Sequence, residues 1–171
     1  QVLGELRPKD PNAIKALAAG VSRSHVLGRY ALKALARYGT QDALRVVVRA
    51  VVDNEMLADQ AIHLLGEAGS AASGAVAEAF ADAPTDKRIR LLQVLARNPG
   101  KELIGPLVHA LATPDISDAA QQIAMAAQGQ MSAALLKDFR SAIARTLDEP
   151  LPEHVGGILL GLAAKFDRSG A

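Results

Sequence analysis

Apolar residues recur along this chain at every third or fourth position, with polar and charged residues between them. Ile14, Leu17 and Val21 form one such stripe, and the same spacing returns through most of the sequence. This period places the apolar side chains on one face of an α-helix, so the pattern predicts a wholly helical chain. The expected helices are 11–22, 24–38, one that starts at Thr40, 56–69, 71–83, 85–98, 101–112, 119–130, 132–147 and 154–166.

Residues that begin or end helices stand between the apolar stripes. Asp10 precedes Pro11, and an Asp cap followed by proline at the first helical position is a common helix start. Thr40 and Ser132 precede two further stripes as capping residues, and Gly39 stands where a left-handed residue ends a helix. These residues divide the chain into short helices joined by short turns.

The sequence repeats itself with a period of 30 residues. Tyr30–Gly39 aligns with Gln60–Gly69, then with Arg90–Pro99 and with Ala120–Gly129. A two-helix unit of this size cannot bury its apolar stripe alone, so stacked neighbours must complete the core. We therefore expect an all-α fold, a right-handed α-α superhelix of about five helix pairs. The expected units are 1–24, 25–54, 55–84, 85–114 and 115–149, followed by a terminal helix at 152–166.

The first residues fit the repeat only in part. Val2, Leu3 and Leu6 fall at the repeat positions of the back half of a first helix, and the chain begins at Gln1. We interpret residues 1–171 as a single repeat domain that is cut from a longer array or has a processed end. No secretory signal pattern is visible in these residues.

Two segments resemble the short HEAT-like repeat of phycobilisome-lyase-type and related bacterial proteins. Glu102–Leu111 is similar to the second helix of that repeat, and Asp53–Gly69 is similar to its linker and first helix. The resemblance spans about residues 10–147 and implies a HEAT-like solenoid. It implies little about activity, because such repeats occur in scaffolds, adaptors and lyase subunits alike. The chain departs from the family at Leu57-Ala58, where the family has Val-Arg, whereas Lys87-Arg88 restores the arginine.

Composition narrows the chemistry that the chain can perform. It has no cysteine, which removes disulfides, zinc-finger sites and thiol catalysis. No stretch of about 20 uncharged apolar residues is present to span a membrane. The formal net charge is +1, so no global field attracts the chain to a membrane surface or to nucleic acid. We expect a cytoplasmic chain without a cofactor.

Basic residues cluster near the start of the chain but form no continuous track. Arg45 and Arg49 are expected on the exposed side of a second helix, where some DNA-repair glycosylases built on HEAT-like repeats carry a basic groove. One repeat later, the same positions are Ala75 and Ala79. A phosphate backbone needs continuous positive potential, and the sequence offers no aromatic stacking platform. The sequence therefore argues against nucleic-acid binding.

The histidines do not follow a metal-site pattern. No two of the four have the i, i+4 spacing of a helical metal site. His63 lies four residues from both Asp59 and Glu67, and a metal or acid–base role there is one interpretation. In the other interpretation, Glu67 forms ion pairs with Arg37 and Arg97, which occupy the same position in the neighbouring repeats. Neighbouring helices pack closely enough for such ion pairs to form. We favour the ion pairs and assign no metal site.

No catalytic constellation is visible in the sequence. The serines lie mostly at caps and linkers, the G-x-S-x-G motif is absent, and the glycines lie mostly at helix ends. Bilin-lyase activity rests on the family resemblance alone. We therefore expect a non-enzymatic protein-interaction scaffold that binds no small molecule. The enzymatic alternative is that the chain is a subunit of a bilin lyase. A third, less favoured function is that of a DNA-binding module.

The exposed face of the second helices is the expected binding surface. It is small and apolar with charges at one end, which suits a helix or an extended peptide. Arg45 and Arg49 lie four residues apart on one helix and can hold a carboxylate, so an acidic amphipathic segment is the expected ligand. Val48 has an alternative interpretation as a core residue. The candidate partner-binding residues are Arg45, Val48, Arg49, Val52, Glu78, Asp82 and His109.

Overall fold

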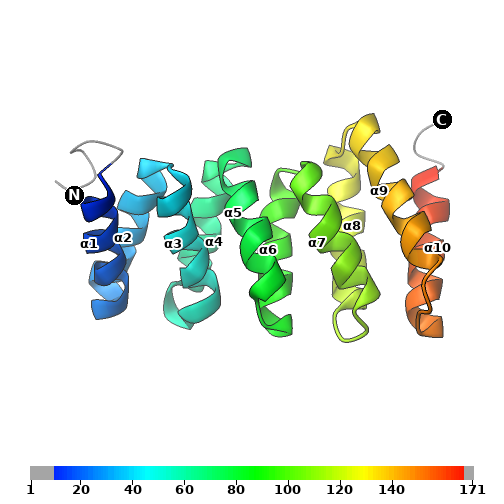
Figure 1. Ribbon diagram of the computed structural model, residues 1–171, viewed down its shortest axis with the longest axis horizontal. Coiled ribbons are helices and arrows are strands. Elements are labelled where there is room, and N and C mark those ends of the chain that lie inside the picture. Colours follow the sequence, from blue (N-terminus) through cyan, green and yellow to red (C-terminus); the bar gives the residue numbers. More distant parts are fainter. Residues whose placement is uncertain (1–9, 168–171) are drawn as a thin grey trace.

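The computed structural model describes residues 10–167, and in that range the chain is helical and has no strands. Within residues 10–167, ten α-helices and one short 3-10 helix follow each other through short turns (Figure 1). The back half of a first helix, expected at 2–6, lies outside the described residues. The helices are α1 (Pro11–Arg23), α2 (His25–Tyr38), α3 (Gln41–Asp53), α4 (Glu55–Ala68), α5 (Ser70–Asp82), α6 (Thr85–Arg97), α7 (Lys101–Ala112), α8 (Ser117–Ala127), η2 (Gln128–Gln130), α9 (Ala133–Leu147) and α10 (Glu153–Asp167).

The capping residues act as the sequence predicts. The Asp10 carboxylate accepts a hydrogen bond from the Asn12 N–H at 2.9 Å. The Thr40 and Ser132 hydroxyls each accept a hydrogen bond from the backbone N–H three residues further on. Gly39 ends α2 with a φ of 63°, a left-handed conformation that glycine adopts without strain. Each cap fixes the point at which a helix begins or stops, so the chain can turn back on itself.

One expected helix is divided in two. The sequence predicts a single helix over 119–130. The structure has two helices there: α8, which starts at Ser117 and ends at Ala127, and η2, which follows it. Gly129 lies within η2 and has low helix propensity, so the last turn tightens into a 3-10 helix.

The helices form a row of two layers (Figure 1). Contacts join α2 to α4, α4 to α6, α6 to α8 and α8 to α10, so the even-numbered helices make one layer. The odd-numbered helices make the other layer, through contacts of α1 with α3, α3 with α5, α5 with α7 and α7 with α9. Contacts therefore run mainly between near neighbours in the chain, as expected of stacked repeat units.

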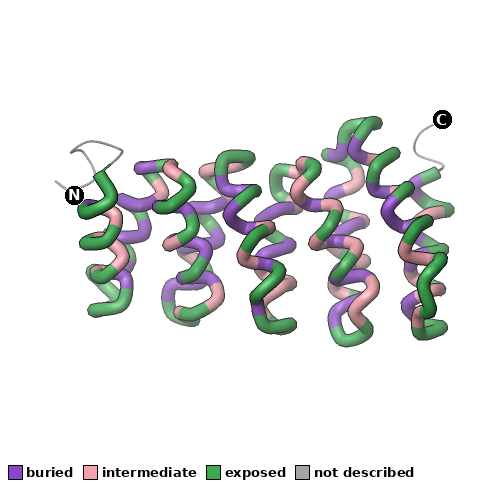
Figure 2. Tube along the Cα trace, viewed as in Figure 1, coloured by how far each residue is buried: buried purple, intermediate pink, exposed green. Residues whose placement is uncertain are grey.

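The core lies between the two layers. Leu35, Leu65 and Leu95 occupy equivalent positions in successive units, and each is at most 2% exposed. Figure 2 shows that buried positions recur along the helices of the row. Val47 and Val48 are buried inside α3, so burial of a helical stripe outweighs the β propensity of this valine run. The 30-residue period thus marks equivalent core positions.

Neighbouring helices approach closely where α2 meets α4. Leu57 of α4 is 1% exposed, and a Cβ atom placed on Gly28 of α2 would lie 2.7 Å from Leu57 Cδ1. Beside this contact, Gln60 Nε2 donates to the Arg29 carbonyl oxygen at 3.1 Å, and Arg29 Nε donates to Gln60 Oε1 at 3.1 Å. The missing side chain at position 28 therefore allows the two helices to pack at this distance.

The expected ion pairs of Glu67 with Arg37 and Arg97 are wrong. Among the described residues, no Lys or Arg pairs with Glu67, and its nearest basic group is His63 on its own helix, whose Nε2 lies 3.5 Å from Glu67 Oε1. The Arg97 side chain lies instead over Gly66, where a Cβ atom would lie 2.8 Å from Arg97 Nη1. Neighbouring even-numbered helices are offset, and their polar side-chain contacts link residues 31 to 37 positions apart.

A different cluster of ion pairs joins α4 to α6. Glu55, at the start of α4, accepts hydrogen bonds from Lys87 Nζ at 2.7 Å and from Arg90 Nη2. The bond from Arg90 and then the bond from Lys87 lower the pKa of Glu55 from 4.5 to about 2. The cluster therefore keeps the Glu55 carboxylate ionised in moderate acid.

Glu55→Gln is expected to reduce the loss of stability in acid. The folded-state pKa lies below the unfolded-state value, so the carboxylate stabilises the fold above pH 4.5, and this stabilisation disappears as the pH falls toward about 2. Urea unfolding at a series of pH values should therefore show a smaller fall in the free energy of unfolding for the variant. An NMR titration in which Arg90→Met leaves the Glu55 pKa unchanged would contradict this explanation.

Candidate functional site

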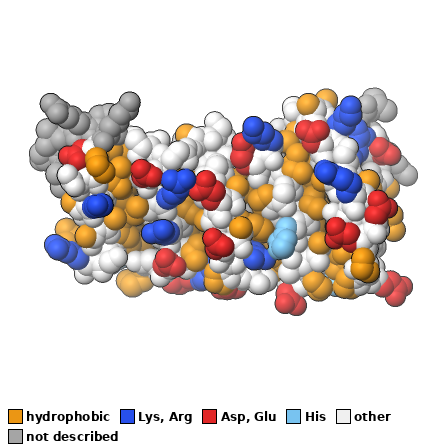
Figure 3. All heavy atoms as spheres, viewed as in Figure 1, with side chains coloured by type: hydrophobic (Ala, Val, Ile, Leu, Met, Phe, Trp, Pro, Cys, Tyr) orange, Lys and Arg blue, Asp and Glu red, His pale blue; other side chains and the backbone are white. Residues whose placement is uncertain are grey.

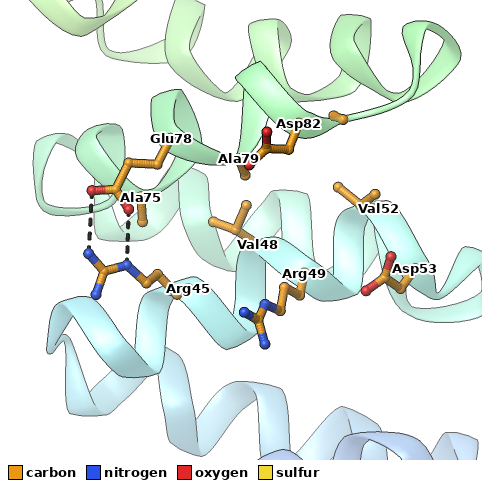
Figure 4. A pocket seen from close by; sticks show the side chains of 10 residues that line it. Arg45, Val48, Arg49, Val52, Asp53, Ala75, Glu78, Ala79 and Asp82 are labelled. Atoms are coloured by element: carbon orange, nitrogen blue, oxygen red, sulfur yellow. Dashed lines mark hydrogen bonds and ion pairs between the residues drawn. The ribbon is translucent and has the colours of Figure 1, made fainter.

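A groove lies between α3 and α5, which are neighbours in the odd-numbered layer. Each residue on the α3 side that lines the groove has its equivalent, 30 residues later, on the α5 side. The same face of both helices therefore lines the groove. The cavity has a volume of about 400 Å³. Six of the seven predicted partner-binding residues meet here. The lining residues are Arg45, Val48, Arg49, Val52 and Asp53 on the α3 side, and Ala75, Glu78, Ala79, Asp82 and Ala83 on the α5 side (Figure 4).

The floor of this α3–α5 groove is apolar. Val48 is 1% exposed and Ala75 is 2% exposed, so both side chains belong to the core. Val52 and Ala79 are partly buried and pack against the core. The interpretation of Val48 as a core residue is therefore correct, whereas Val52 and Ala79 offer apolar surface that a ligand can reach.

Arg45 is already paired at one end of the groove. Its Nε and Nη2 donate to the two carboxylate oxygens of Glu78 at 3.0 and 3.3 Å, and its Nη1 donates to Asp42 at 3.0 Å. The hydrogen bond and charge of Arg45 lower the pKa of Glu78, and Glu78 in turn raises the pKa of Arg45. The fork that the sequence analysis assigned to a partner's carboxylate is therefore filled by the chain's own acids.

Arg49 lies one turn further along α3 and has no ion-pair partner within residues 10–167. Figure 4 shows its side chain directed away from Glu78. Asp53 and Asp82 line the groove near Val52, and they too form no ion pair with any described residue. The groove therefore offers a ligand one unpaired cation and two unpaired carboxylates.

His109 belongs to a second groove, which lies between α7 and α9. The four lining positions Gly105, Val108, His109 and Ala112 are the equivalents, 30 residues later, of the positions that α5 contributes to the first groove. This α7–α9 groove has a volume of about 490 Å³. The structure therefore separates His109 from the other six predicted residues, although it keeps them on equivalent faces. The remaining lining residues are Ile104, Ala142, Arg145, Thr146 and Glu149.

Arg88 contacts His109, although it is not among the site residues predicted from the sequence. Arg88 Nη1 lies 2.8 Å from His109 Nε2, and the guanidinium carbon lies 5.4 Å from the centre of the Phe80 ring. Arg88 also donates to the carbonyl oxygens of Ala83 and Ala81 at 3.0 and 3.2 Å. Through Arg88 of α6, the cluster links the end of α5 to His109 of α7 and positions the imidazole. In the sequence, Arg88 stands out only as the arginine of Lys87-Arg88, on which part of the resemblance to the HEAT-like repeat rests.

The charges on the face shown in Figure 3 are mixed. Basic and acidic side chains are interspersed there, with hydrophobic side chains between them. In the α3–α5 groove, Arg45 and Arg49 face a helix whose equivalent positions are Ala75 and Ala79. This face therefore lacks the continuous basic track that a phosphate backbone requires.

Metal ligands and membrane spans give no further candidate site in the described part of the chain. Within residues 10–167, no group of three or more His, Asp or Glu side chains converges to hold a metal ion. His63 with Asp59 and Glu67, the one candidate raised by the sequence, does not form such a group. No helix in the same range combines the length and apolar character that crossing a bilayer requires.

Comparison of this chain with protein-family models finds no match, and comparisons with curated proteins and with solved structures find none either. The site is therefore interpreted from its own geometry.

Proposed function

We propose that this chain is a HEAT-like solenoid, coiled as a right-handed superhelix, that acts as a non-enzymatic protein-interaction scaffold. Its partner lies along the odd-numbered layer as a helix or an extended segment. The observation that carries the proposal is the recurrence of one groove, because equivalent positions of α3, α5 and α7 line two cavities in the same layer. A segment that follows the repeats can enter both cavities.

The charges of the α3–α5 groove define the chemistry of the partner. The acidic amphipathic segment that the sequence predicts would meet Glu78, Asp53 and Asp82 as well as Arg49. Like charges repel across an interface, and opposite charges fix the register of a bound segment. We therefore expect an amphipathic segment with an apolar face against Val52, a carboxylate near Arg49 and a basic residue near the two aspartates.

The size of the grooves sets the length of the partner. A specific protein interface buries on the order of 800 Å² on each partner, which is more than a few side chains between two helices can supply. An occupant that spans the α3–α5 and α7–α9 grooves reaches further residues, including His109. The proposal therefore requires a segment several helical turns long.

A charge exchange in the groove is expected to weaken partner binding by at least about tenfold, which is about 1.4 kcal/mol. The groove variant combines Arg49→Glu with Asp82→Lys, which reverses the unpaired cation and one of the two unpaired carboxylates and preserves the net charge. The matched control combines Lys33→Glu with Asp59→Lys, which lie exposed on the even-numbered layer. A pull-down from native lysate identifies the partner, and titration calorimetry with that partner then compares the two variants.

Circular dichroism must first show that both variants keep the helical spectrum of the original chain. Loss of binding in the groove variant alone supports the proposal. Loss of binding in the control, with the groove variant unaffected, would place the partner on the even-numbered layer and refute it.

A further inference from the structure

A third cavity, of about 400 Å³, lies at the edge of the row where α4 and α6 end and α5 and α7 begin. It shares no lining residue with the α3–α5 groove or the α7–α9 groove. Ser70 and Ser73 line it from the first turn of α5, Arg97 from the end of α6 and Glu102 from the first turn of α7. Polar side chains and the starts of two helices therefore surround this cavity.

Ser73 carries a buried hydroxyl that the fold does not use. The residue is 6% exposed, and its side chain forms no hydrogen bond with any other described residue. Its equivalents in the neighbouring repeats, Ala43 and Leu103, are apolar and are 0% and 1% exposed. Within residues 10–167, Arg90 Nη1 is the one fully enclosed side-chain polar atom without a partner, so the Ser73 hydroxyl keeps some access, and Ser73 lines the cavity. Buried hydroxyls normally have a hydrogen-bond partner, so this one indicates a ligand in the cavity.

The start of α5 also offers unused hydrogen-bond donors. Gly69 stands at its N-cap, so no side chain caps the helix, and its first turn has no acidic residue. At α3, by contrast, the hydroxyl of Thr40, the equivalent of Ser70, accepts a hydrogen bond from the Ala43 N–H at 3.4 Å. The first N–H groups of a helix and the positive end of its dipole attract anions.

The charged residues of the cavity favour one anionic group. Arg97 is exposed and forms no ion pair within the described part of the chain. The Glu102 carboxylate lies over the start of its own helix, because a Cβ atom placed on Gly100 would lie 2.8 Å from Glu102 Oε2. A carboxylate in the first turn offsets the positive end of α7. Arg97 and the positive end of α5 have no such counter-charge among the described residues.

We propose that this cavity binds a phosphate group, held by Arg97, by the hydroxyls of Ser70 and Ser73 and by the first N–H groups of α5. The several oxygens of a phosphate match this set of donors, and arginine holds two of those oxygens with its planar fork. Glu102 repels a second anionic group, so the site takes a single phosphate. The cavity is larger than one phosphate ion, so the group can be free or belong to a small phosphorylated metabolite. This inference is independent of the two grooves and of their partner.

NMR titration of the backbone amide signals with inorganic phosphate tests the site. The signals at the start of α5 should shift with a dissociation constant on the order of 1 mM. Ser73→Ala and Arg97→Gln should each weaken binding by at least about tenfold, which is the effect of losing a hydrogen bond to a charged group. Alanine fits at position 73, since its equivalent Ala43 is fully buried. Arg37→Gln is the matched control, because Arg37 is the exposed equivalent of Arg97 two repeats earlier and does not line the cavity.

Two further titrations define the ligand and the role of the carboxylate. Glycerol 3-phosphate is compared with inorganic phosphate: tighter binding of the ester assigns the site to a phosphorylated metabolite, and tighter binding of the inorganic ion assigns it to free phosphate. Glu102→Gln should strengthen the binding of either, because it removes a like charge from the cavity.

Three results would overturn the inference. If no amide signal shifts at phosphate concentrations on the order of 100 mM, the cavity holds no phosphate. Equal affinity of the original chain, Ser73→Ala and Arg97→Gln would mean an adventitious ion only. Weaker binding by Glu102→Gln would show that the carboxylate holds the ligand, so the ligand is not a simple anion. Circular dichroism confirms that each variant is folded, and Arg97→Lys, which keeps the charge but lacks the fork, replaces Arg97→Gln if that variant is not.

Discussion

Leu65→Ala and Leu95→Ala are each expected to lower the free energy of unfolding by about 2–5 kcal/mol. Both side chains lie in the core between the layers and are 0% and 2% exposed. Removing three carbon atoms from either leaves a cavity that the surrounding helices fill only in part. Total stabilities of folded domains are on the order of 5–15 kcal/mol, so either variant removes a large share.

Urea unfolding followed by circular dichroism measures this change. Leu160→Ala is the control, because Leu160 is 60% exposed and its truncation should change the free energy of unfolding by at most about 0.5 kcal/mol. Equal effects of the buried and exposed substitutions would contradict the assignment of Leu65 and Leu95 to equivalent core positions.

Gly28→Val is expected to destabilise the chain by about 1–3 kcal/mol, because it adds volume to a closely packed joint. Its Cβ would lie 2.7 Å from Leu57 Cδ1 and 3.0 Å from the Val21 carbonyl oxygen. Leu57 is 1% exposed and has little room to move, and the carbonyl belongs to the backbone of α1. Either α4 must shift away from α2 or the end of α1 must be displaced.

Thermal unfolding of Gly28→Val and Gly157→Val separates packing from helix propensity. Both glycines lie within helices, but a Cβ atom on Gly157 meets nothing within 4 Å. Valine has a higher helix propensity than glycine, so Gly157→Val should not lower the melting temperature. A similar melting temperature for the two variants would show that the joint of α2 and α4 is not closely packed.

The position of the groove can be predicted from the sequence because it depends on helix faces. The 30-residue period places Arg49 and Ala79 on equivalent faces of α3 and α5, and both line the same cavity. Likewise, the period predicts burial of Leu65 and Leu95 without any knowledge of the contacts that they make. A period and a helical spacing are enough to decide which side of a helix faces its neighbours.

The polar contacts between neighbouring helices cannot be predicted in the same way. Arg45 pairs with Glu78, 33 residues away, and Glu55 pairs with Lys87 and Arg90, 32 and 35 residues away. These separations exceed the repeat because neighbouring helices are offset and long side chains reach past their equivalents. Charges aligned at a separation of 30 residues therefore predict neither cluster.

Photo-crosslinking at single positions tests the proposed groove most directly. A photoreactive amino acid at Ala79, in the α3–α5 groove, is compared with one at Lys33, which is exposed on α2 in the other layer. After irradiation in the presence of the captured partner, Ala79 should give the crosslinked complex and Lys33 should give none. Crosslinking from Lys33 with none from Ala79 would contradict the account.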